Sequence, residues 1–239
     1  GASTALNFVV GNAVPTIASL NPSGVTIGQK TTVTVNGDKF VAGAQVLVWD
    51  RRGALRARDA GHEGTVRALR WSPTGDRLLI GGDDGQARII RVQGMDPSRE
   101  SRVLRGHTAA ISDLAWHPGG DLVATAASDG SVRVWSLVPG AAARLEHPGA
   151  VQDLRWEPGG ARLACAGDDG KVRLFPRDGV AAPQILDHGR RVLAVAWSPD
   201  GRQLASAGAG PRVRVWSADG GLLRELPTGG RGDVLAVTW

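Results

Sequence analysis

An internal repeat of about 40 residues constrains the fold of this chain more than any other feature. One histidine opens each copy, and successive histidines are 45, 40 and 41 residues apart, at His62, His107, His147 and His188. A tryptophan column has spacings of 45, 40, 41 and 42 residues, at Trp71, Trp116, Trp156, Trp197 and Trp239. An aromatic or aliphatic column steps by 41, 45, 40 and 41 residues, at Trp49, Ile90, Trp135, Phe175 and Trp216. Three columns that keep one period indicate a repeated structural unit.

Each copy contains the signals of about four short β-strands. Val-Arg-Val-Trp, at 132–135 and again at 213–216, alternates in the manner of a strand packed between sheets. Pro-Gly, Pro-Asp-Gly, Asp-Asp-Gly and Ser-Asp-Gly mark tight turns between such strands. One four-stranded sheet cannot bury both of its faces, whereas stacking several sheets around an axis buries them. The repeat therefore predicts an all-β fold of radially stacked sheets.

The repeated motifs resemble the WD-repeat family over residues 44–239. The Gly-His opening stands at Gly61-His62 and Gly106-His107, and the turn Asp-Gly at Asp84-Gly85, Asp129-Gly130 and Asp169-Gly170. The closing Trp-Asp stands at Trp49-Asp50. The resemblance implies a β-propeller with four clear four-stranded blades and partial blades beside them.

The family resemblance also implies a structural role for the repeated histidine. Members of the family often link His, Ser/Thr, Asp and Trp of one blade in a buried hydrogen-bond chain. The second copy has all four members, at His107, Thr125, Asp129 and Trp135. The other copies lack at least one member, through Ile80, Ile90, Cys165, Phe175 and Gly210. We expect these histidines to pack the blades, not to catalyse a reaction or bind a metal.

The N-terminal segment does not continue the repeat. Residues 1–43 resemble the first half of a bacterial immunoglobulin-like IPT/TIG domain, through Pro-Thr-Ile-Ala-Ser-Leu, Thr-Val-Thr-Val and Gly-Asp-Lys-Phe. Two explanations of the chain ends stay open. The ring closes when Asp233–Trp239 joins 44–49 and 54–59 in one composite blade, or the sequence is part of a larger propeller. The second is favoured, because five blades are unusual for the family.

Motifs for catalysis or cofactor binding are missing from the sequence. It contains no Gly-x-Ser-x-Gly, His-Glu-x-x-His or Gly-x-x-x-x-Gly-Lys motif, and its single cysteine, Cys165, fills the Ser/Thr position of a blade. The paired carboxylates Asp83-Asp84 and Asp168-Asp169 lie in turns, where Asp is favoured for local hydrogen bonding. Arg231-Gly232-Asp233 also falls in a predicted loop. We predict no catalytic residue, cofactor or metal, and keep a propeller enzyme with a central-channel site as the less favoured alternative.

Charge and composition favour protein partners. The net charge is +5, but the basic residues are scattered among 23 acidic residues, which does not favour nucleic acid. No apolar run reaches the roughly 18 residues of a membrane span. The resemblance implies a partner-binding face on the loops that enter the blades. Its predicted residues are Thr65, Arg67, Asp83, Ser112, Ser128, Gln152, Asp168, Arg191 and Leu193.

The residue usage suggests a source and leaves the location open. Arginine outnumbers lysine 25 to 3 and tyrosine is absent, as in proteins of GC-rich bacterial genomes. An IPT/TIG-like segment implies an extracytoplasmic or surface location, and a propeller alone suits the cytoplasm equally well. We predict a protein-interaction scaffold. The alternative is a structural subunit of a surface or filament assembly, completed by strand addition from another chain.

Overall fold

The computed structural model describes residues 16–21, 34–38, 45–50, 55–59, 61–92, 101–138 and 143–239. The chain divides into two units, 1–111 and 112–239, and each is described by itself. All regular structure in the described ranges is β-strand. The strands before the unit boundary are β1 (Thr16–Asn21), β2 (Thr34–Asp38), β3 (Val46–Trp49), β4 (Leu55–Asp59), β5 (Val66–Trp71), β6 (Arg77–Gly82), β7 (Ala87–Arg91) and β8 (Arg102–Leu104). They are followed by β9 (Ile111–Trp116), β10 (Leu122–Ala127), β11 (Ser131–Ser136), β12 (Ala143–Glu146), β13 (Val151–Trp156), β14 (Arg162–Gly167), β15 (Lys171–Pro176), β16 (Gln184–Asp187), β17 (Val192–Trp197), β18 (Gln203–Gly208), β19 (Arg212–Ser217) and β20 (Leu222–Pro227).

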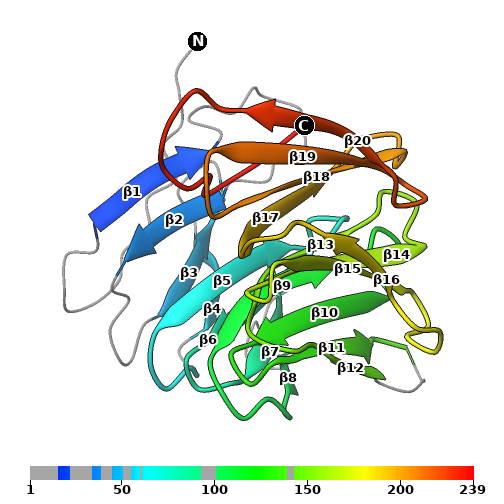
Figure 1. The fold of residues 1–239 in the computed structure, drawn as a ribbon. Coiled ribbons are helices and arrows are strands. Elements are labelled where there is room, and N and C mark those ends of the chain that lie inside the picture. The colour runs from blue at the N-terminus through cyan, green and yellow to red at the C-terminus, as the bar shows by residue number, and fades with distance from the viewer. Residues whose placement is uncertain are drawn as a thin grey trace. The chain divides into compact units, whose positions relative to one another are not determined.

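Each repeat forms one four-stranded antiparallel sheet, as the sequence predicted. The sheets are β5–β8, β9–β12, β13–β16 and β17–β20, and within each of them the strands follow chain order (Figure 1). Tight turns make this order possible, because two neighbouring antiparallel strands need only a short connection. The turn between β6 and β7 requires a glycine at Gly85. Its φ is +69°, and a Cβ there would lie 3.0 Å from the carbonyl oxygen of Ala109, so a larger residue would be strained.

The first strand of three repeats carries the same irregularity. The register between the first and second strands shifts between Val66 and Ala68, between Val151 and Asp153, and between Val192 and Ala194. A β-bulge at this position turns two successive residues toward the protein interior. The recurrence shows that the repeat extends to details of the backbone.

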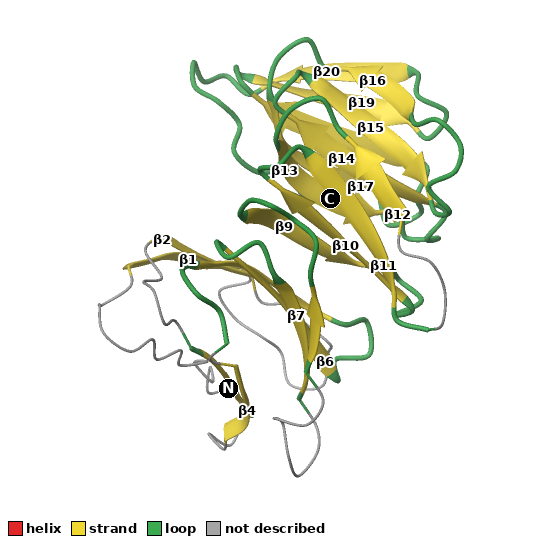
Figure 2. Cartoon of the chain, turned by 90° about the horizontal axis from the view of Figure 1, so that it is seen from below, coloured by secondary structure: helices red, strands yellow, loops and turns green. Residues whose placement is uncertain are grey.

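In the second unit, consecutive sheets pack face to face (Figure 2). Val132 and Leu145 of the second repeat form one cluster with Leu154 and Trp156 of the third. A second cluster joins the third repeat to the fourth and contains Trp197. The tryptophan side chains that end β13 and β17 are each 8% exposed. These two tryptophans therefore lie between consecutive sheets.

The strands β3 and β4 form a two-stranded hairpin in the first unit. Val46, Val48 and Ala57 pack against the first repeat, in a cluster that includes Leu78 and Ile80. In the same way, the third and fourth strands of the second repeat, β11 and β12, pack against the third repeat. The hairpin therefore takes the place of the last two strands of a preceding sheet. The segment ending at Trp49 thus belongs to the repeat architecture.

The last residues of the chain lie beside the fourth repeat. The Val234 N–H donates to the Gly208 carbonyl over 2.9 Å, and Trp239 Nε1 donates to the Ala196 carbonyl over 2.8 Å. The second contact repeats the one in which Trp197 Nε1 donates to the Arg155 carbonyl over 3.2 Å. Residues 233–239 thus occupy the place of a first strand. Their union with β3 and β4 in one blade stays a prediction, because those strands belong to the other unit.

One part of the predicted N-terminal segment can be compared with the structure. β1 and β2 form a two-stranded antiparallel sheet, and most of residues 1–43 lie outside the described ranges. The IPT/TIG-like resemblance is therefore untested. Within the described part of the chain, no helix is long and apolar enough to span a membrane.

Candidate interaction face

The predicted partner-binding residues come from two backbone segments that meet at one end of each sheet. The Asp83 N–H donates to the Thr65 carbonyl over 2.9 Å, and the Asp168 N–H donates to the Ala150 carbonyl over 3.0 Å. These bonds join the entry to the first strand with the turn between the second and third strands. We call this end of each sheet the loop face.

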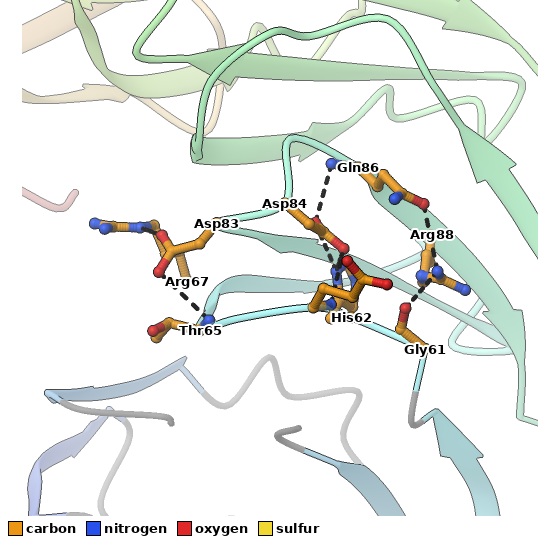
Figure 3. Close-up of polar contacts among 9 residues, drawn as sticks. Gly61, His62, Thr65, Arg67, Asp83, Asp84, Gln86 and Arg88 are labelled. Atoms are coloured by element: carbon orange, nitrogen blue, oxygen red, sulfur yellow. Dashed lines mark hydrogen bonds and ion pairs between the residues drawn. The ribbon is translucent and has the colours of Figure 1, made fainter. Parts of the chain in front are cut away.

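In the first repeat, the loop face carries a carboxylate paired with a guanidinium. Arg67 Nε donates to Asp83 Oδ1, and the Thr65 N–H donates to Asp83 Oδ2 over 3.4 Å (Figure 3). Partial burial alone would raise the pKa of Asp83, but the hydrogen bonds from Arg67 and Thr65 hold that pKa below its ordinary value. The structure thus brings these three predicted residues together.

In the second unit, one carboxylate connects two consecutive repeats on the loop face. Asp168 Oδ1 accepts a hydrogen bond from Gln152 Nε2 over 2.9 Å and one from Arg191 Nε over 2.8 Å. Gln152 and Asp168 belong to the third repeat, and Arg191 precedes the first strand of the fourth. Asp168 therefore links the two neighbouring sheets and orients the side chains of Gln152 and Arg191.

Both ion pairs remain open to solvent. The side chains of Arg67 and Asp83 are 53% and 32% exposed, and those of Arg191 and Asp168 are 53% and 37% exposed. Exposed ion pairs of this kind contribute about 0–1 kcal/mol to stability. Because the ion pairs are weak and exposed, little energy is lost when they open. Their guanidinium and carboxylate groups can therefore form hydrogen bonds with a partner.

The other three predicted residues lie in different surroundings. Ser112 Oγ donates to the Val151 carbonyl over 2.6 Å, so this hydroxyl joins two repeats. Ser128 is exposed at the turn after β10, and Leu193 is half-buried within β17. Of these three, Ser128 is the most accessible to a partner.

The repeated histidines have the predicted structural surroundings in two repeats. His62 Nδ1 lies 3.0 Å from Asp84 Oδ1 (Figure 3). In the fourth repeat, His188 Nδ1 lies 2.9 Å from Ser206 Oγ, which accepts a hydrogen bond from Trp216 Nε1 over 2.8 Å. Buried polar groups are tolerated when they are bonded in this way.

The complete set predicted in the second repeat is divided between the two units. Trp135 Nε1 donates to Thr125 Oγ1 over 3.0 Å, and Asp129 Oδ1 accepts from the Ser131 N–H over 2.9 Å. His107 is half-buried in the other unit, so its link to Thr125 stays a prediction.

The third repeat contains a buried arginine that the sequence interpretation missed. Arg173 Nη1 donates to His147 Nε2 over 2.9 Å, and its Nη2 lies 2.6 Å from Asp169 Oδ2. Burial and the charge of Arg173 lower the pKa of His147, so the imidazole is neutral and accepts this bond. In this repeat Cys165 and Phe175 replace the hydroxyl and the indole of the usual hydrogen-bond chain, so neither can bond to His147. Arg173 supplies the buried hydrogen bond to His147 instead. The signal was an arginine two residues before the aromatic or aliphatic column in each third strand, at Arg88, Arg133, Arg173 and Arg214.

A second missed cluster joins the second and third repeats. Asp113 Oδ2 accepts from the Leu154 N–H, and Asp153 Oδ2 accepts from the Val195 N–H, each over 2.9 Å. Arg155 Nη1 lies 3.1 Å from Asp113 Oδ2 and 2.6 Å from Asp153 Oδ1. Burial raises the pKa of Asp153, against the effect of the Arg155 charge, and the neighbouring Asp113 carboxylate raises it further. The signal was an aspartate at the third position of both Ile-Ser-Asp-Leu and Val-Gln-Asp-Leu.

The carboxyl groups of Asp113 and Asp153 each tie the first strand of one repeat to the first strand of the following repeat. Each accepts a main-chain N–H that belongs to a neighbouring sheet, so their placement is explained by packing.

Cys165 is fully buried, and burial raises the pKa of its thiol, which makes it a poor nucleophile. No group of three or more His, Cys, Asp or Glu in the described ranges is arranged to hold a metal ion.

Comparison with known proteins agrees with this architecture. Residues 54–91, 98–136, 142–175 and 183–217 match the family described as WD domain, G-beta repeat. A guanine nucleotide-binding protein subunit beta from Oryza sativa subsp. japonica is 40% identical over 63 residues. This match covers 24% of the chain and 17% of the rice protein, so the chain spans a small part of that relative. The four family matches together cover more than half of the chain, and each contains the first three strands of one four-stranded sheet together with the strand that precedes them in the chain. The chain belongs to the WD40 repeat family.

Proposed function

We propose that this chain is a non-catalytic scaffold that binds protein partners through the loop face. The observation that carries the proposal is the bridge at Asp168, which holds Gln152 and Arg191 from two consecutive repeats in one exposed polar cluster. Arg67 and Asp83 form the corresponding pair in the first repeat. Side chains that are already oriented lose less conformational entropy when a partner binds.

The chemistry of the loop face favours a polar protein contact. Arg67 and Asp83 have opposite charges, as do Arg191 and Asp168, and Thr65, Ser112, Ser128 and Gln152 are neutral. A nucleic-acid site would need an excess of cations to neutralise several phosphates. We therefore assign a partner with a mixed-charge surface, for which Ser128 and the two ion pairs supply hydrogen-bond donors and acceptors.

The non-catalytic part of the proposal rests on the surroundings of the polar groups. WD40 relatives are typically scaffolds without enzymatic activity. The buried carboxylates Asp113 and Asp153 bind main-chain N–H groups, and His62, His147 and His188 bind partners within their own repeats.

We also place the propeller at residues 44–239 and a separate segment at 1–43. The contact of β3 with the first repeat supports this boundary.

The test is retention of partner proteins on the immobilised chain at low and high salt. The variant Arg67→Glu with Arg191→Glu places two like-charged pairs on the loop face, and retention of a protein partner should fall at least about tenfold. The control is Arg202→Glu with Arg224→Glu, which changes the net charge equally at exposed positions outside the loop face. Equal retention by both variants would show that the loop face is not the binding site. Nucleic acid that is released by moderate salt would show that the partner class is wrong.

A further inference from the structure

The loop face of the fourth repeat differs from that of the other repeats in the turn between its second and third strands. The other three turns share an aspartate before a glycine, at Asp84, Asp129 and Asp169. The corresponding residue of the fourth repeat is Gly210, and the residue before it is Ala209. The turn of the fourth repeat therefore contributes no carboxylate to the loop face.

A second replacement in the fourth repeat lies next to this turn. In the third repeat, Gln152 Nε2 donates to Asp168 Oδ1 over 2.9 Å, so the second residue of the first strand reaches the first residue of the turn. At the same two positions the fourth repeat has Leu193 and Ala209, and both are half-buried. A polar contact of the third repeat thus corresponds to an apolar spot in the fourth.

Arg190 places a guanidinium beside the turn that lacks the aspartate. Its Nη1 atom lies 3.8 Å from the position that a Cβ atom at Gly210 would take. Arg190 is exposed, and among the described residues no carboxylate lies within ion-pair distance of it. Asp233 Oδ1 accepts the Gly210 N–H over 2.9 Å, so that carboxylate is bound to the main chain of the turn. Arg190 is thus a cation without a counter-charge, next to the place where the other repeats have an acidic side chain.

The main chain of Arg190 is held between two turns. Its N and C atoms lie 3.1 and 3.2 Å from the position of a Cβ atom at Gly170, in the turn of the third repeat. On the other side, the Ala209 N–H donates to the carbonyl of the neighbouring Arg191 over 2.8 Å. Arg191 pairs with Asp168, whereas Arg190 can pair with a partner. A side chain on a fixed main chain loses less conformational entropy on binding than one in a free loop.

We infer that the fourth repeat binds an apolar side chain and a neighbouring carboxylate of a partner protein. The site consists of Arg190, Leu193, Ala209 and Gly210, and we call it the fourth-repeat site. The apolar side chain covers Leu193 and Ala209, and the carboxylate pairs with Arg190. This inference rests on the proposed function, because it names the chemistry of the segment that binds at one part of the loop face.

Each half of this pattern has a physical reason. A guanidinium binds a carboxylate through two parallel N–H···O bonds, which fixes the direction of approach. An apolar side chain that is buried against Leu193 adds affinity, and the ion pair adds specificity. An amide in place of the carboxylate would leave Arg190 without a counter-charge. A segment with Gln or Asn at this position should therefore bind more weakly.

The test is the selection of short random peptides, displayed on phage, on the immobilised full chain at physiological salt. The selected peptides should contain Asp or Glu close to a large apolar residue. Each is then synthesised in two versions, one with the acid and one with the corresponding amide. Binding of both versions to the full chain and to Arg190→Gln gives a double-mutant cycle. The amide version should bind the full chain about fivefold more weakly, and Arg190→Gln should bind the two versions equally.

Two further variants show whether the site is specific. Leu193→Gln with Ala209→Asp gives the fourth repeat the polar pair of the third, so binding of the selected peptides should be lost. Arg202→Gln removes an exposed cation from the turn at the other end of the same sheet. It should distinguish the acid and amide versions as well as the full chain does. Equal thermal unfolding of Arg190→Gln and Arg202→Gln shows that both variants are folded.

The inference is overturned if the selected peptides lack an acidic residue. It is also overturned if no peptide prefers the full chain to Leu193→Gln with Ala209→Asp, or if Arg190→Gln still distinguishes the acid from the amide.

Failure of the inference can be told apart from failure of the proposed function. If retention of a protein partner falls with Arg67→Glu and Arg191→Glu but not with Arg190→Gln, the proposed function stands and the inference fails. If the peptides bind through Arg190 while partner retention is insensitive to Arg67→Glu and Arg191→Glu, the fourth-repeat site stands and the wider loop face is not the binding surface.

Discussion

Arg155 lies between two buried carboxylates, with its Nη1 atom 3.1 Å from Asp113 Oδ2 and 2.6 Å from Asp153 Oδ1. The two aspartates belong to consecutive repeats, and each binds a main-chain N–H of the following repeat. One guanidinium therefore supports two contacts between neighbouring sheets.

Replacing Arg155 should destabilise the protein strongly. Arg155→Leu leaves two neighbouring carboxylates without a counter-charge, and the free energy of unfolding should fall by about 3 kcal/mol. The side chain of Arg155 is 40% exposed, which keeps the loss at the lower end of values for buried pairs. Asp153→Asn should cost less than about 1 kcal/mol, because the amide oxygen still accepts the Val195 N–H and the amide is uncharged, like the protonated carboxyl that the raised pKa of Asp153 favours. Denaturant unfolding of both variants checks this, and equal losses would disprove the role of charge.

The hydrogen-bond chain of the fourth repeat predicts a cost for losing its central hydroxyl. Ser206 is fully buried and serves both His188 and Trp216. Ser206→Ala should lower the free energy of unfolding by about 1–3 kcal/mol, since both neighbours lose a partner in the interior. Cys165→Ala is the matched control, because Cys165 occupies the same strand position next to Phe175. A cost for Cys165→Ala as large as that for Ser206→Ala would show that packing, not hydrogen bonding, sets the effect.

The buried histidine of the fourth repeat makes stability depend on pH. Burial and the nearby Arg214 lower the pKa of His188 to about 4. In the unfolded chain this pKa is about 6.5, so between about pH 6.5 and 4 the unfolded state binds a proton that the folded state does not. His188 therefore supports stability above pH 6.5, and its contribution falls as the pH is lowered, by about 2–3 kcal/mol at pH 4.

The His188→Gln variant isolates this contribution. Asp153 acts in the opposite direction, because its raised pKa makes the folded state bind the additional proton, but Asp153 is present in both proteins. The difference in unfolding free energy between wild type and variant should therefore shrink as the pH falls from 7.5 to 4.5. Parallel pH profiles for the two proteins would contradict the assignment.

The tryptophan columns predict unequal costs at two corresponding positions. Trp197 is 8% exposed and lies in the cluster between the third and fourth repeats, whereas Trp239 is 50% exposed. Trp197→Ala should cost about 3–5 kcal/mol through the cavity that it leaves. Trp239→Ala should cost less than half of that, because it removes mainly one hydrogen bond and a partly exposed ring. Thermal and denaturant unfolding measure both values, and equal costs would mean that the two residues have equivalent surroundings.

The sequence predicted the sheets well because three residue columns repeat with the strands. Turn glycines, the tryptophans that end β13 and β17, and the buried Cys165 all follow from position within the repeat. Asp153 does not follow, because the bulge in β13 turns both Asp153 and Leu154 inward, where simple alternation would place one of them at the surface.

Arg173 was missed for a different reason. Arginine is usually exposed, and only the loss of the hydroxyl and indole from the third repeat creates the buried space and the polar partners for it. On the loop face, the sequence predicted which residues lie at the same end of their sheets. It did not predict that Asp168 would join Gln152 to Arg191, because this bond depends on the packing of two repeats.

The central claim is that protein partners bind at the loop face, and site-specific photo-crosslinking tests it most directly. A photoreactive residue is placed at Ser128 or Gln152 on the loop face, or at Arg202 in the turn at the other end of the fourth sheet. Cross-linked products are then identified by mass spectrometry. The account predicts that Ser128 and Gln152 capture the same protein partner and that Arg202 does not. Capture of that partner mainly through Arg202, or of nucleic acid at all three positions, would contradict the claim.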